Sequence, residues 1–332
     1  MNRLLTFISF YVLCIVNHCT GKEIDEQPLL RLGLIGLDTS HVIAFTSRLN
    51  EPDSPNHVPG ARVIAAFKGG SDDIESSRTR VEGYTKTLVE KYGVKIYDDI
   101  SKLCKDVDAI LLTSLDGRPH LSQIRPVIQA KLPVFVDKPI AGSLKDAVEI
   151  FRLAKEANVP CFSSSSLRWY SGVVEVANAD VGQLKSAISY GPAPAEPHHP
   201  DLFWYGIHPT ESLFTVMGPG CESVTRTSTD DTIVVTGIWK DGKVGTLHGI
   251  ASGRTGYKVT AFGTKAIAEQ KSGGDYTPML REIIKFFRTG KPPVSPDITL
   301  EIYAFMEAAD ESKRRGGLPV KISEVLKKAG LN

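Results

Sequence analysis

Apolar strand-like segments alternate with helix-like segments over residues 30–162, and this alternation restricts the fold of the chain more than any other feature. The expected strands are 30–36, 61–67, 94–97, 108–113, 134–136 and 160–162, and the expected helices are 79–92, 121–130 and 144–157. Strands that are apolar on both faces and are joined through helices indicate a parallel, doubly wound sheet. We therefore expect an N-terminal Rossmann-like α/β domain over residues 30–162.

The pattern changes after about residue 165. Strand-like segments now follow one another through short turns, at 184–190, 231–239, 243–251 and 257–262. Asp241-Gly242 is typical of a tight hairpin, and Ser295 is suited to cap a terminal helix over 296–315. We expect a second, α+β domain over residues 163–332, built on a mainly antiparallel sheet.

Residues 1–21 have the pattern of a secretory signal peptide. Arg3 provides a positive charge, an apolar run covers 4–16, and a polar stretch ends at Gly21. The run is shorter than the roughly 20 residues that a permanent membrane helix needs. We expect export to the periplasm or the medium, with 22–29 as a charged tether; a buried N-terminal helix is the alternative.

The cysteines and the charge exclude several classes of protein. Cys14 and Cys19 would leave with the signal peptide, and the remaining Cys104, Cys161 and Cys221 are too few for a disulfide scaffold. We expect these three to be buried thiols. With 39 basic and 38 acidic residues, the chain lacks the charge excess of a nucleic-acid-binding protein.

Several short motifs occur in a familiar order. They are Asp-Gly-Arg-Pro-His at 116–120, Asp-Lys-Pro at 137–139, Arg-Trp at 168–169 and Gly-Ile-His-Pro-Thr-Glu at 206–211. In order and spacing this set resembles the glucose–fructose oxidoreductase/inositol dehydrogenase (Gfo/Idh/MocA) family. The resemblance covers nearly the whole chain after the signal peptide.

The resemblance implies a dinucleotide-binding domain, an open antiparallel sheet through which two copies pair, and NAD(P)-dependent chemistry on a sugar or cyclitol. It implies that Lys138 polarises the substrate oxygen and that His208 is the general acid/base. The candidate cofactor-binding residues are Gly36, Leu37, Asp38, Thr39, Ser40, His41, Lys68, Ser71, Ser114, His120, Asp137, Lys138 and Arg168, and the candidate substrate-binding residues are Tyr170, Trp204, Tyr205 and Glu211.

The loop after the first expected strand departs from the dinucleotide fingerprint G-x-G-x-x-G. Gly36 is present, but Asp38 and His41 stand at the second and third glycine positions. One interpretation is that Asp38 turns away and caps the next helix, while Thr39, Ser40 and the helix N-terminus bind phosphate. The alternative is an ordinary turn in a protein that has lost the dinucleotide.

The end of the second expected strand also lacks the acidic residue that binds the ribose of NAD. Lys68, Ser71 and the nearby Arg78 are suited to the 2′-phosphate of NADP instead. NADP is therefore favoured over NAD if a cofactor binds. An isolated surface lysine explains Lys68 equally well.

The two candidate catalytic residues have separate physical arguments. Lys138 follows a parallel strand at its carboxyl end, where open α/β sheets bind ligands. His208 is expected near a helix N-terminus, which lowers the pKa of an imidazole. The plain alternatives are a loop lysine and a capping histidine.

The segment before His208 departs from the family. Trp204 replaces the family's acidic residue four positions earlier, and Asp201 is a candidate substitute. Trp204 and Tyr205 could stack on a sugar ring or pack in the core. His198 and His199 are adjacent in a Pro-rich loop, and we expect no metal there.

The sequence therefore predicts an exported NAD(P)-dependent oxidoreductase that acts on a sugar or cyclitol. A non-catalytic carbohydrate-binding protein without the dinucleotide is the first alternative. A redox-neutral hydrolase or lyase that retains its cofactor is the second. A small molecule is the expected partner in each case, and neither nucleic acid nor a membrane is expected after signal cleavage.

Overall fold

A computed structural model describes residues 28–331. The predicted signal peptide lies outside these residues. Within the described part, no helix is both long and apolar enough to cross a membrane. The described cysteines, Cys104, Cys161 and Cys221, are buried free thiols, as expected, and burial raises the pKa of Cys104 to about 11.

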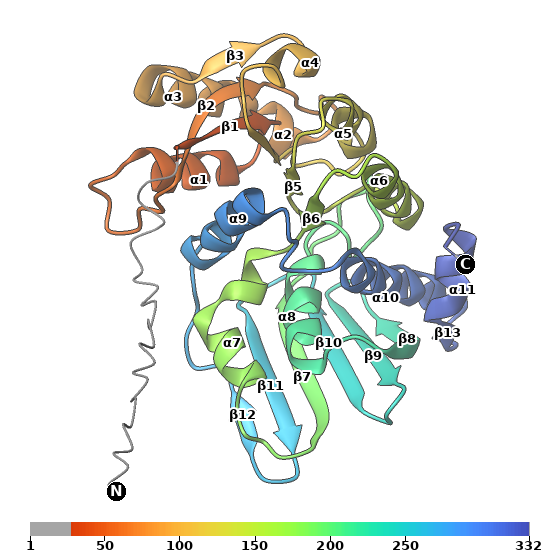
Figure 1. Cartoon of the computed structure of the whole chain (residues 1–332). Helices are drawn as coiled ribbons and strands as arrows, with labels where there is room; N and C mark the ends of the chain where they lie inside the picture. The colour runs from red at the N-terminus through yellow and green to blue at the C-terminus, as the bar shows by residue number, and fades with distance from the viewer. Residues whose placement is uncertain (1–27, 332) are drawn as a thin grey trace, which may run out of the picture.

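The first sheet has six parallel strands in the order β3-β2-β1-β4-β5-β6 (Figure 1). The prediction of a parallel, doubly wound sheet is confirmed. The strands are β1 (Leu30–Ile35), β2 (Ala61–Phe67), β3 (Lys95–Tyr97), β4 (Ala109–Leu112), β5 (Val134–Val136) and β6 (Cys161–Ser163). The helices between them are α1 (Ser40–Asn50), α2 (Glu75–Arg78), α3 (Val81–Tyr92), α4 (Ile100–Leu103), α5 (His120–Gln129) and α6 (Leu144–Glu156).

Both faces of this sheet are buried, which explains its apolar strands. Along β4, Ala109 and Leu111 belong to the apolar cluster that contains α1 and α3, whereas Ile110 and Leu112 belong to the cluster that contains α4, α5 and α6. Because successive side chains of a strand point to opposite faces, a strand between two helical layers must be apolar throughout.

Helix α9 (Thr277–Thr289) also packs on the first sheet, beside α1 (Figure 1). It comes after most of the second sheet in the sequence, so the chain returns to the Rossmann domain. This helix was not among the predicted elements, although Met279, Leu280, Ile283 and Phe287 form an apolar face at helical spacing.

The second sheet has seven strands in the order β12-β11-β7-β10-β9-β8-β13. Only β7 and β10 pair in parallel; the other pairs are antiparallel, as predicted, and the Asp241-Gly242 hairpin joins β9 to β10. The strands are β7 (Leu184–Pro192), β8 (Cys221–Ser228), β9 (Thr232–Trp239), β10 (Val244–Ile250), β11 (Lys258–Gly263), β12 (Ile267–Glu269) and β13 (Val320–Lys321).

Helices cover one face of the second sheet. They are η1 (Ser166–Trp169), α7 (Ser171–Ala177), α8 (Ile207–Met217), α10 (Pro296–Arg314) and α11 (Ile322–Lys328). The helix predicted at 296–315 is α10, but it is not the last, since α11 follows it. Strand β8 was also missed, because its polar sequence hides a buried face that includes Arg226.

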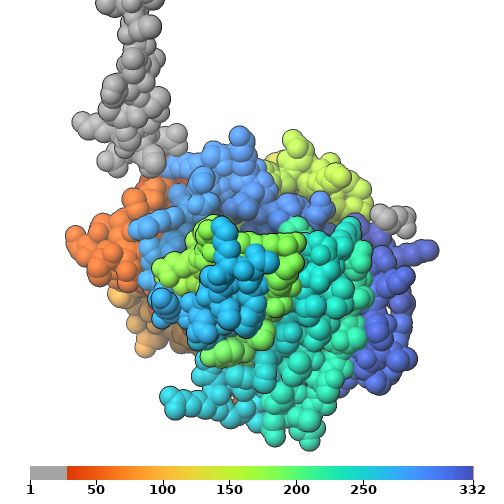
Figure 2. Space-filling model, turned by 90° about the horizontal axis from the view of Figure 1, so that it is seen from below, coloured from red at the N-terminus to blue at the C-terminus, as the bar shows by residue number. Residues whose placement is uncertain are grey.

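The other face of the second sheet carries exposed apolar side chains. Ile188, Tyr190 and Ile238 are 41%, 37% and 42% exposed. Figure 2 views the second domain from the side away from the Rossmann sheet, with the segments of the second sheet lying next to one another. Apolar residues gathered on one open sheet face are typical of an interaction surface.

Candidate active site

Lys138 and His208 meet where the two domains join. Lys138 follows β5 at the carboxyl edge of the first sheet, and His208 is the second residue of α8. Both contact the ring of Tyr205, whose centroid is 5.4 Å from Lys138 Nζ and 5.2 Å from the His208 ring centroid. The structure thus brings together the two candidate catalytic residues, as the resemblance implies.

Neighbouring hydrogen bonds fix the loop that carries Lys138. Asp137 Oδ1 accepts a hydrogen bond from the Lys138 N–H at 2.8 Å, and the amide of Ile140 donates to Tyr303 Oη on α10 at 2.9 Å. The Lys138–Pro139 peptide bond is cis. The backbone here is held from both domains.

The Lys138 ammonium is buried without an ion-pair partner among the described residues. Burial lowers the pKa of Lys138, and the carboxylates of Asp137 and Asp38 offset this only in part. Nζ also makes no hydrogen bond within residues 28–331 and lies over the Tyr205 ring. A buried cation left in this way is unfavourable for folding, so a ligand is the expected partner.

His208 is neutral in these surroundings. Burial and the positive charges of Lys138 and His41 hold its pKa well below the usual value. The pKa of His208 is thus lowered, as expected, but the lowering comes from burial and neighbouring charges, whereas a helix N-terminus was the expected cause. His208 Nδ1 lies 2.7 Å from Ser165 Oγ, and the N-cap of α8 is Gly206, so His208 does not cap this helix.

Asp201 does not serve as the partner of His208, contrary to the candidate role given above. Its carboxylate accepts hydrogen bonds from Arg226 Nη2 at 2.8 Å and Lys313 Nζ at 2.7 Å. The Trp204 ring packs against the ring of His199, with 4.9 Å between the ring centroids. Of the Trp204-Tyr205 pair, only Tyr205 contacts the candidate catalytic residues.

Glu211 and Arg168 bind each other. Arg168 Nε donates to Glu211 Oε1, and Ser164 Oγ donates to the same oxygen at 3.3 Å. Arg168 Nη2 is buried and has no partner among the described residues. Glu211 therefore orients Arg168, and the free nitrogen is the group that remains for a ligand.

Half-buried tyrosines border the same space. Tyr257 is 6.0 Å from His208 between ring centroids, and Tyr276 is 4.9 Å from His41. Burial raises the pKa of Tyr257 and of Tyr276, and the nearby Tyr170 and Tyr205 add to both shifts. Neutral tyrosines present both an apolar ring face and a hydroxyl to a ligand.

The glycine loop keeps its first glycine for a steric reason. Gly36 has φ of +88°, and a Cβ at this position would lie 2.4 Å from the Cα of Ser114. Ser114 is itself buried, with Oγ donating to Gln123 Oε1 at 2.8 Å. Leu37 is fully buried in the core. Gly36, Leu37 and Ser114 therefore shape the loop without offering side-chain polar groups to a ligand.

Asp38 does not cap α1, which corrects the first interpretation of the loop. Thr39 is the N-cap and accepts from the His41 amide. The Asp38 carboxylate is fully buried and accepts from the Leu115 amide at 2.9 Å and from Ser77 Oγ at 2.6 Å. Asp38 thus links the loops after β2 and β4.

The N-terminus of α1 fits a phosphate group. The amides of Asp38, Thr39 and Ser40 have no hydrogen-bond acceptor within residues 28–331, and the Ser40 side chain is exposed. Free amides and the positive end of a helix dipole favour an anion. Because the Asp38 carboxylate is bonded elsewhere, it leaves these amides available.

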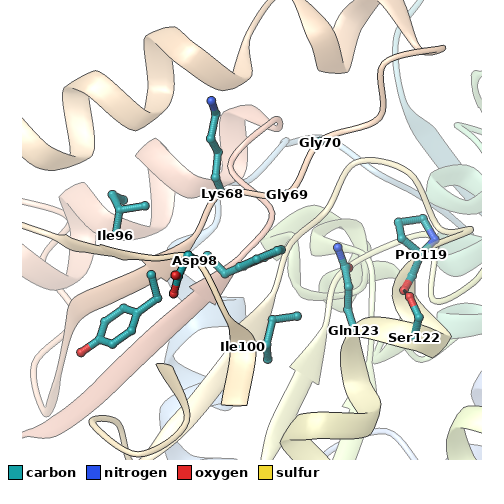
Figure 3. A pocket seen from close by; sticks show the side chains of 11 residues that line it. Lys68, Gly69, Gly70, Ile96, Asp98, Ile100, Pro119, Ser122 and Gln123 are labelled. Atoms are coloured by element: carbon teal, nitrogen blue, oxygen red, sulfur yellow. Dashed lines mark hydrogen bonds between the residues drawn. The ribbon is translucent and has the colours of Figure 1, made fainter. Parts of the chain in front are cut away.

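A cavity of about 840 Å³ lies at the carboxyl ends of β2 and β3 (Figure 3). Lys68, Gly69 and Gln123 are among its lining residues. In a doubly wound sheet ligands bind outside this edge, so the cavity has room for the adenosine half of a dinucleotide. The free amides of α1 and this cavity together fit such a cofactor.

The remaining candidate cofactor residues have protein partners. Lys68 forms an ion pair with Glu82 on α3, and Ser71 Oγ donates to Asp116 Oδ2 at 2.6 Å. His120 is fully buried, with Nδ1 and Nε2 at 3.1 and 2.9 Å from the carbonyl oxygens of Ile140 and Ser114. Its position ties two loops together and does not reach the cavity.

His41 has a partner that the sequence did not indicate. Its Nδ1 contacts Asp137 Oδ2, and the ring packs against Phe45 and Tyr276. Burial tends to raise the pKa of Asp137, but His41 and Lys138 hold it below its usual value. Among the described residues no group of three or more His, Cys, Asp or Glu side chains could hold a metal ion.

Solved structures share this fold over most of the chain. A probable dehydrogenase from Thermotoga maritima is 22% identical, with a TM-score of 0.72, over 89% of this chain and all of its own. Apo scyllo-inositol dehydrogenase from Lactobacillus casei is 14% identical, with a TM-score of 0.73, over 90% of this chain and 99% of its own.

Myo-inositol dehydrogenase from Lactobacillus casei, solved with NAD(H) and myo-inositol, is 17% identical with a TM-score of 0.69. The match covers 89% of this chain and 97% of the enzyme. No curated protein sequence matches the chain. Residues 60–165 match the model of an oxidoreductase family with an NAD-binding Rossmann fold, and the match begins after the altered glycine loop. These residues are thus similar to that oxidoreductase family, and the described part of the chain has the two-domain fold of the solved dehydrogenases.

Proposed function

We propose that this protein is an exported, NAD(P)-dependent oxidoreductase that oxidises or reduces a hydroxyl-bearing carbon of a sugar or cyclitol. One observation carries the proposal: Lys138 Nζ, His208 Nε2 and Arg168 Nη2 make no hydrogen bond within residues 28–331, their side chains are largely buried, and Arg168 Nη2 is completely buried. Unpaired polar atoms in a buried site are costly unless a ligand satisfies them.

Lys138 and His208 are the groups for the reacting hydroxyl. The positive end of Lys138 polarises the oxygen, and His208 is its acid/base partner, since a neutral imidazole can donate to or accept from a hydroxyl. The bound dinucleotide supplies the hydride acceptor or donor. Asp137 and the Ile140–Tyr303 hydrogen bond hold Lys138 in position.

A polyhydroxylated ring suits the rest of the site. Aromatic faces of Tyr170, Tyr205, Tyr257 and Tyr276 can cover the apolar faces of such a ring, and Arg168 can bind its hydroxyl groups. The solved dehydrogenases with bound myo-inositol and scyllo-inositol support a cyclitol as the first substrate to test.

The choice of dinucleotide depends on Lys68. The expected preference for NADP rests on a free cation at the end of β2, but Lys68 is paired with Glu82 and Ser71 with Asp116. An ammonium already neutralised by a carboxylate attracts a 2′-phosphate less strongly. We therefore propose NAD as the cofactor, with NADP as the second dinucleotide in every titration.

Export is the part of the proposal that rests on residues 1–21 alone. Since free nicotinamide cofactor is scarce outside the cytoplasm, the protein would carry its dinucleotide with it and retain it between turnovers. Sequencing the N-terminus of the secreted protein tests this, with Lys22 as the expected first residue. We also propose that two copies pair through the open face of the second sheet, around Ile188, Tyr190 and Ile238.

The carbohydrate-binding alternative has an observation in its favour. Ser71–Asp116 and Asp73–Arg118 contacts join the segment after β2 to the loop after β4, and the Asp38–Ser77 contact joins it to the loop after β1, at the carboxyl edge of the first sheet. A dinucleotide that bound along this edge would have to fit beside these joined loops. If these loops stay joined and exclude the dinucleotide, the site binds a sugar without a cofactor.

Mass spectrometry of the denatured, purified protein decides between these functions. The oxidoreductase should release a nicotinamide dinucleotide or bind added NAD or NADP in calorimetry. Absence of both, together with binding of myo-inositol or glucose, would establish the carbohydrate-binding protein. A retained dinucleotide that stays in one redox state during turnover would establish the redox-neutral enzyme.

A further inference from the structure

The candidate active site contains a second imidazole, His41. It stands at the third glycine position of the loop, yet its ring reaches the site, because Nδ1 contacts Asp137, the residue directly before Lys138. His41 and its partner Asp137 are both buried. A side chain that fills a glycine position and meets a buried carboxylate needs an explanation beyond loop packing.

The hydrogen bonds assign a proton to Nδ1 of His41. Asp137 Oδ1 already accepts from the Lys138 amide at 2.8 Å, and the pKa of Asp137 lies below its usual value in spite of burial, so the carboxylate acts as an acceptor. The His41 Nδ1–H therefore donates to Asp137 Oδ2. In the neutral ring, Nε2 then carries a lone pair, and the hydrogen bond recorded for this ring within residues 28–331 is at Nδ1.

The hydrogen bonds of His208 assign the opposite tautomer. Ser165 Oγ already accepts from the Leu167 amide at 3.2 Å, and among the described residues its hydroxyl proton has only His208 Nδ1, at 2.7 Å, as an acceptor. With Nδ1 accepting, the proton of the neutral His208 ring is on Nε2. The site thus holds one imidazole that donates and one that accepts.

We propose that His41, paired with Asp137, is the proton acceptor of this site, and that His208 is the hydrogen-bond donor which holds the substrate oxygen beside Lys138. The inference rests on the proposed oxidoreductase function and divides its acid/base role between two residues. A carboxylate behind an imidazole stabilises the protonated ring, as in hydrolase triads, and of the two imidazoles His41 and His208 it is His41 that contacts one.

The proton and electron balance of alcohol oxidation is complete with these groups. The C–H bond breaks with its electron pair, which passes as hydride to the oxidised dinucleotide. The O–H bond breaks, its proton goes to His41 Nε2, and a C=O bond forms. Lys138 and the Nε2–H of His208 stabilise the oxygen as the proton leaves.

Matched glutamine variants test the division. Glutamine keeps an N–H donor but cannot take up a proton, so His208→Gln should retain turnover within about tenfold of the wild type. His41→Gln should lose about 10²–10⁴-fold, the usual contribution of a positioned base. His57→Gln is the control, since His57 contacts the Arg48 carbonyl outside the site. Turnover is measured with myo-inositol, scyllo-inositol and glucose, each with NAD and NADP.

Chemical rescue separates proton transfer from loop structure. His41→Gly restores the third glycine of the fingerprint, so dinucleotide binding should be kept or improved. Turnover should fall as in His41→Gln, and added imidazole should restore part of it. Imidazole should not stimulate His57→Gln or the wild type. Wild-type turnover in His41→Gly, or equal losses in both glutamine variants, would overturn the inference.

Nitrogen NMR of the histidine-labelled protein gives a readout that needs neither substrate nor cofactor. The expected tautomers are Nδ1–H for His41 and Nε2–H for His208, with a downfield Nδ1 proton that disappears in Asp137→Asn. The reverse assignment would overturn the inference. A wild type without dinucleotide binding or turnover defeats the proposed function itself, and this result differs from turnover that is insensitive to His41.

Discussion

Arg226 and Lys138 are both buried cations, but their surroundings differ. Arg226, on β8, donates to Asp310 Oδ1 at 2.5 Å and to Asp201 Oδ2 at 2.8 Å, which link the second sheet to α10 and to the loop before α8. Lys138 has no such partner, and its ammonium faces the ring of Tyr205. The charge of Arg226 is compensated by carboxylates of the protein, whereas the charge of Lys138 is available to a ligand.

This difference separates a structural charge from a functional one. A buried charge with carboxylate partners stabilises one arrangement of the chain, and removing either side leaves the other uncompensated. A buried charge without partners makes folding less favourable and is retained where a ligand needs it. Variants of Arg226 should therefore affect stability alone, and variants of Lys138 should affect activity.

The largest expected effect is on turnover. Lys138→Ala and His208→Ala should each lower kcat by about 10²–10⁴-fold, because each removes a group positioned at the reacting hydroxyl. Lys265→Ala is the control, since Lys265 is exposed and paired with Asp180 in the second domain. Steady-state kinetics with the cyclitol and dinucleotide that support wild-type turnover measure the effect. Near-normal kcat in both variants would remove these roles.

The next largest effect is on stability. Arg226→Met should lower the free energy of unfolding by about 3–5 kcal/mol, because the Asp201 and Asp310 carboxylates lose their shared partner. Chemical denaturation measures this loss, and turnover below the melting temperature should stay normal. If Arg226→Met instead reduced kcat in the folded protein, the contrast between the two cations would not hold.

Asp38 gives an intermediate case in the cofactor loop. Asp38→Gly should lower the free energy of unfolding by about 1–3 kcal/mol, because the Leu115 amide and Ser77 hydroxyl lose their acceptor. This exceeds the cost of a lost helix cap, the role first expected of Asp38. Dinucleotide affinity should be kept or improved, since the free amides of α1 remain. Calorimetry with NAD and NADP tests this, and a wild type and variant that both fail to bind would defeat the cofactor hypothesis.

Local sequence patterns predicted most of the strands of the first sheet. They predicted few of the contacts of the loop after β1, which contains Asp38. The apolar runs of β1, β2, β4 and β5 indicate buried strands, because burial on both faces leaves a continuous apolar sequence. The partners of Asp38 at positions 77 and 115 are far away in sequence. No periodicity encodes such a contact, so the capping role was the local guess and was wrong.

The same limit applies to the candidate site. The family resemblance brought Lys138 and His208 together, but the His41–Asp137 contact joins residues 96 positions apart and has no counterpart in the motifs. A histidine at a glycine position was the available signal, and it was interpreted only as a departure from the dinucleotide fingerprint. Likewise Arg226 is hidden in a polar strand, and only the fold shows that it is buried.

The smallest expected effect concerns the stability of Lys138 itself. Since burial lowers its pKa in the folded protein, the unfolded chain binds more protons, and the contribution of Lys138 to stability rises with pH toward the unfolded pKa near 10.5. At neutral pH the free energy of unfolding of Lys138→Met should thus equal that of the wild type or exceed it by up to about 1 kcal/mol. The difference should shrink as the pH rises from neutral to about 10. Urea denaturation of both proteins across this range measures it. A variant clearly less stable than the wild type at neutral pH would mean that Lys138 has a stabilising partner, and the two buried cations would then be alike.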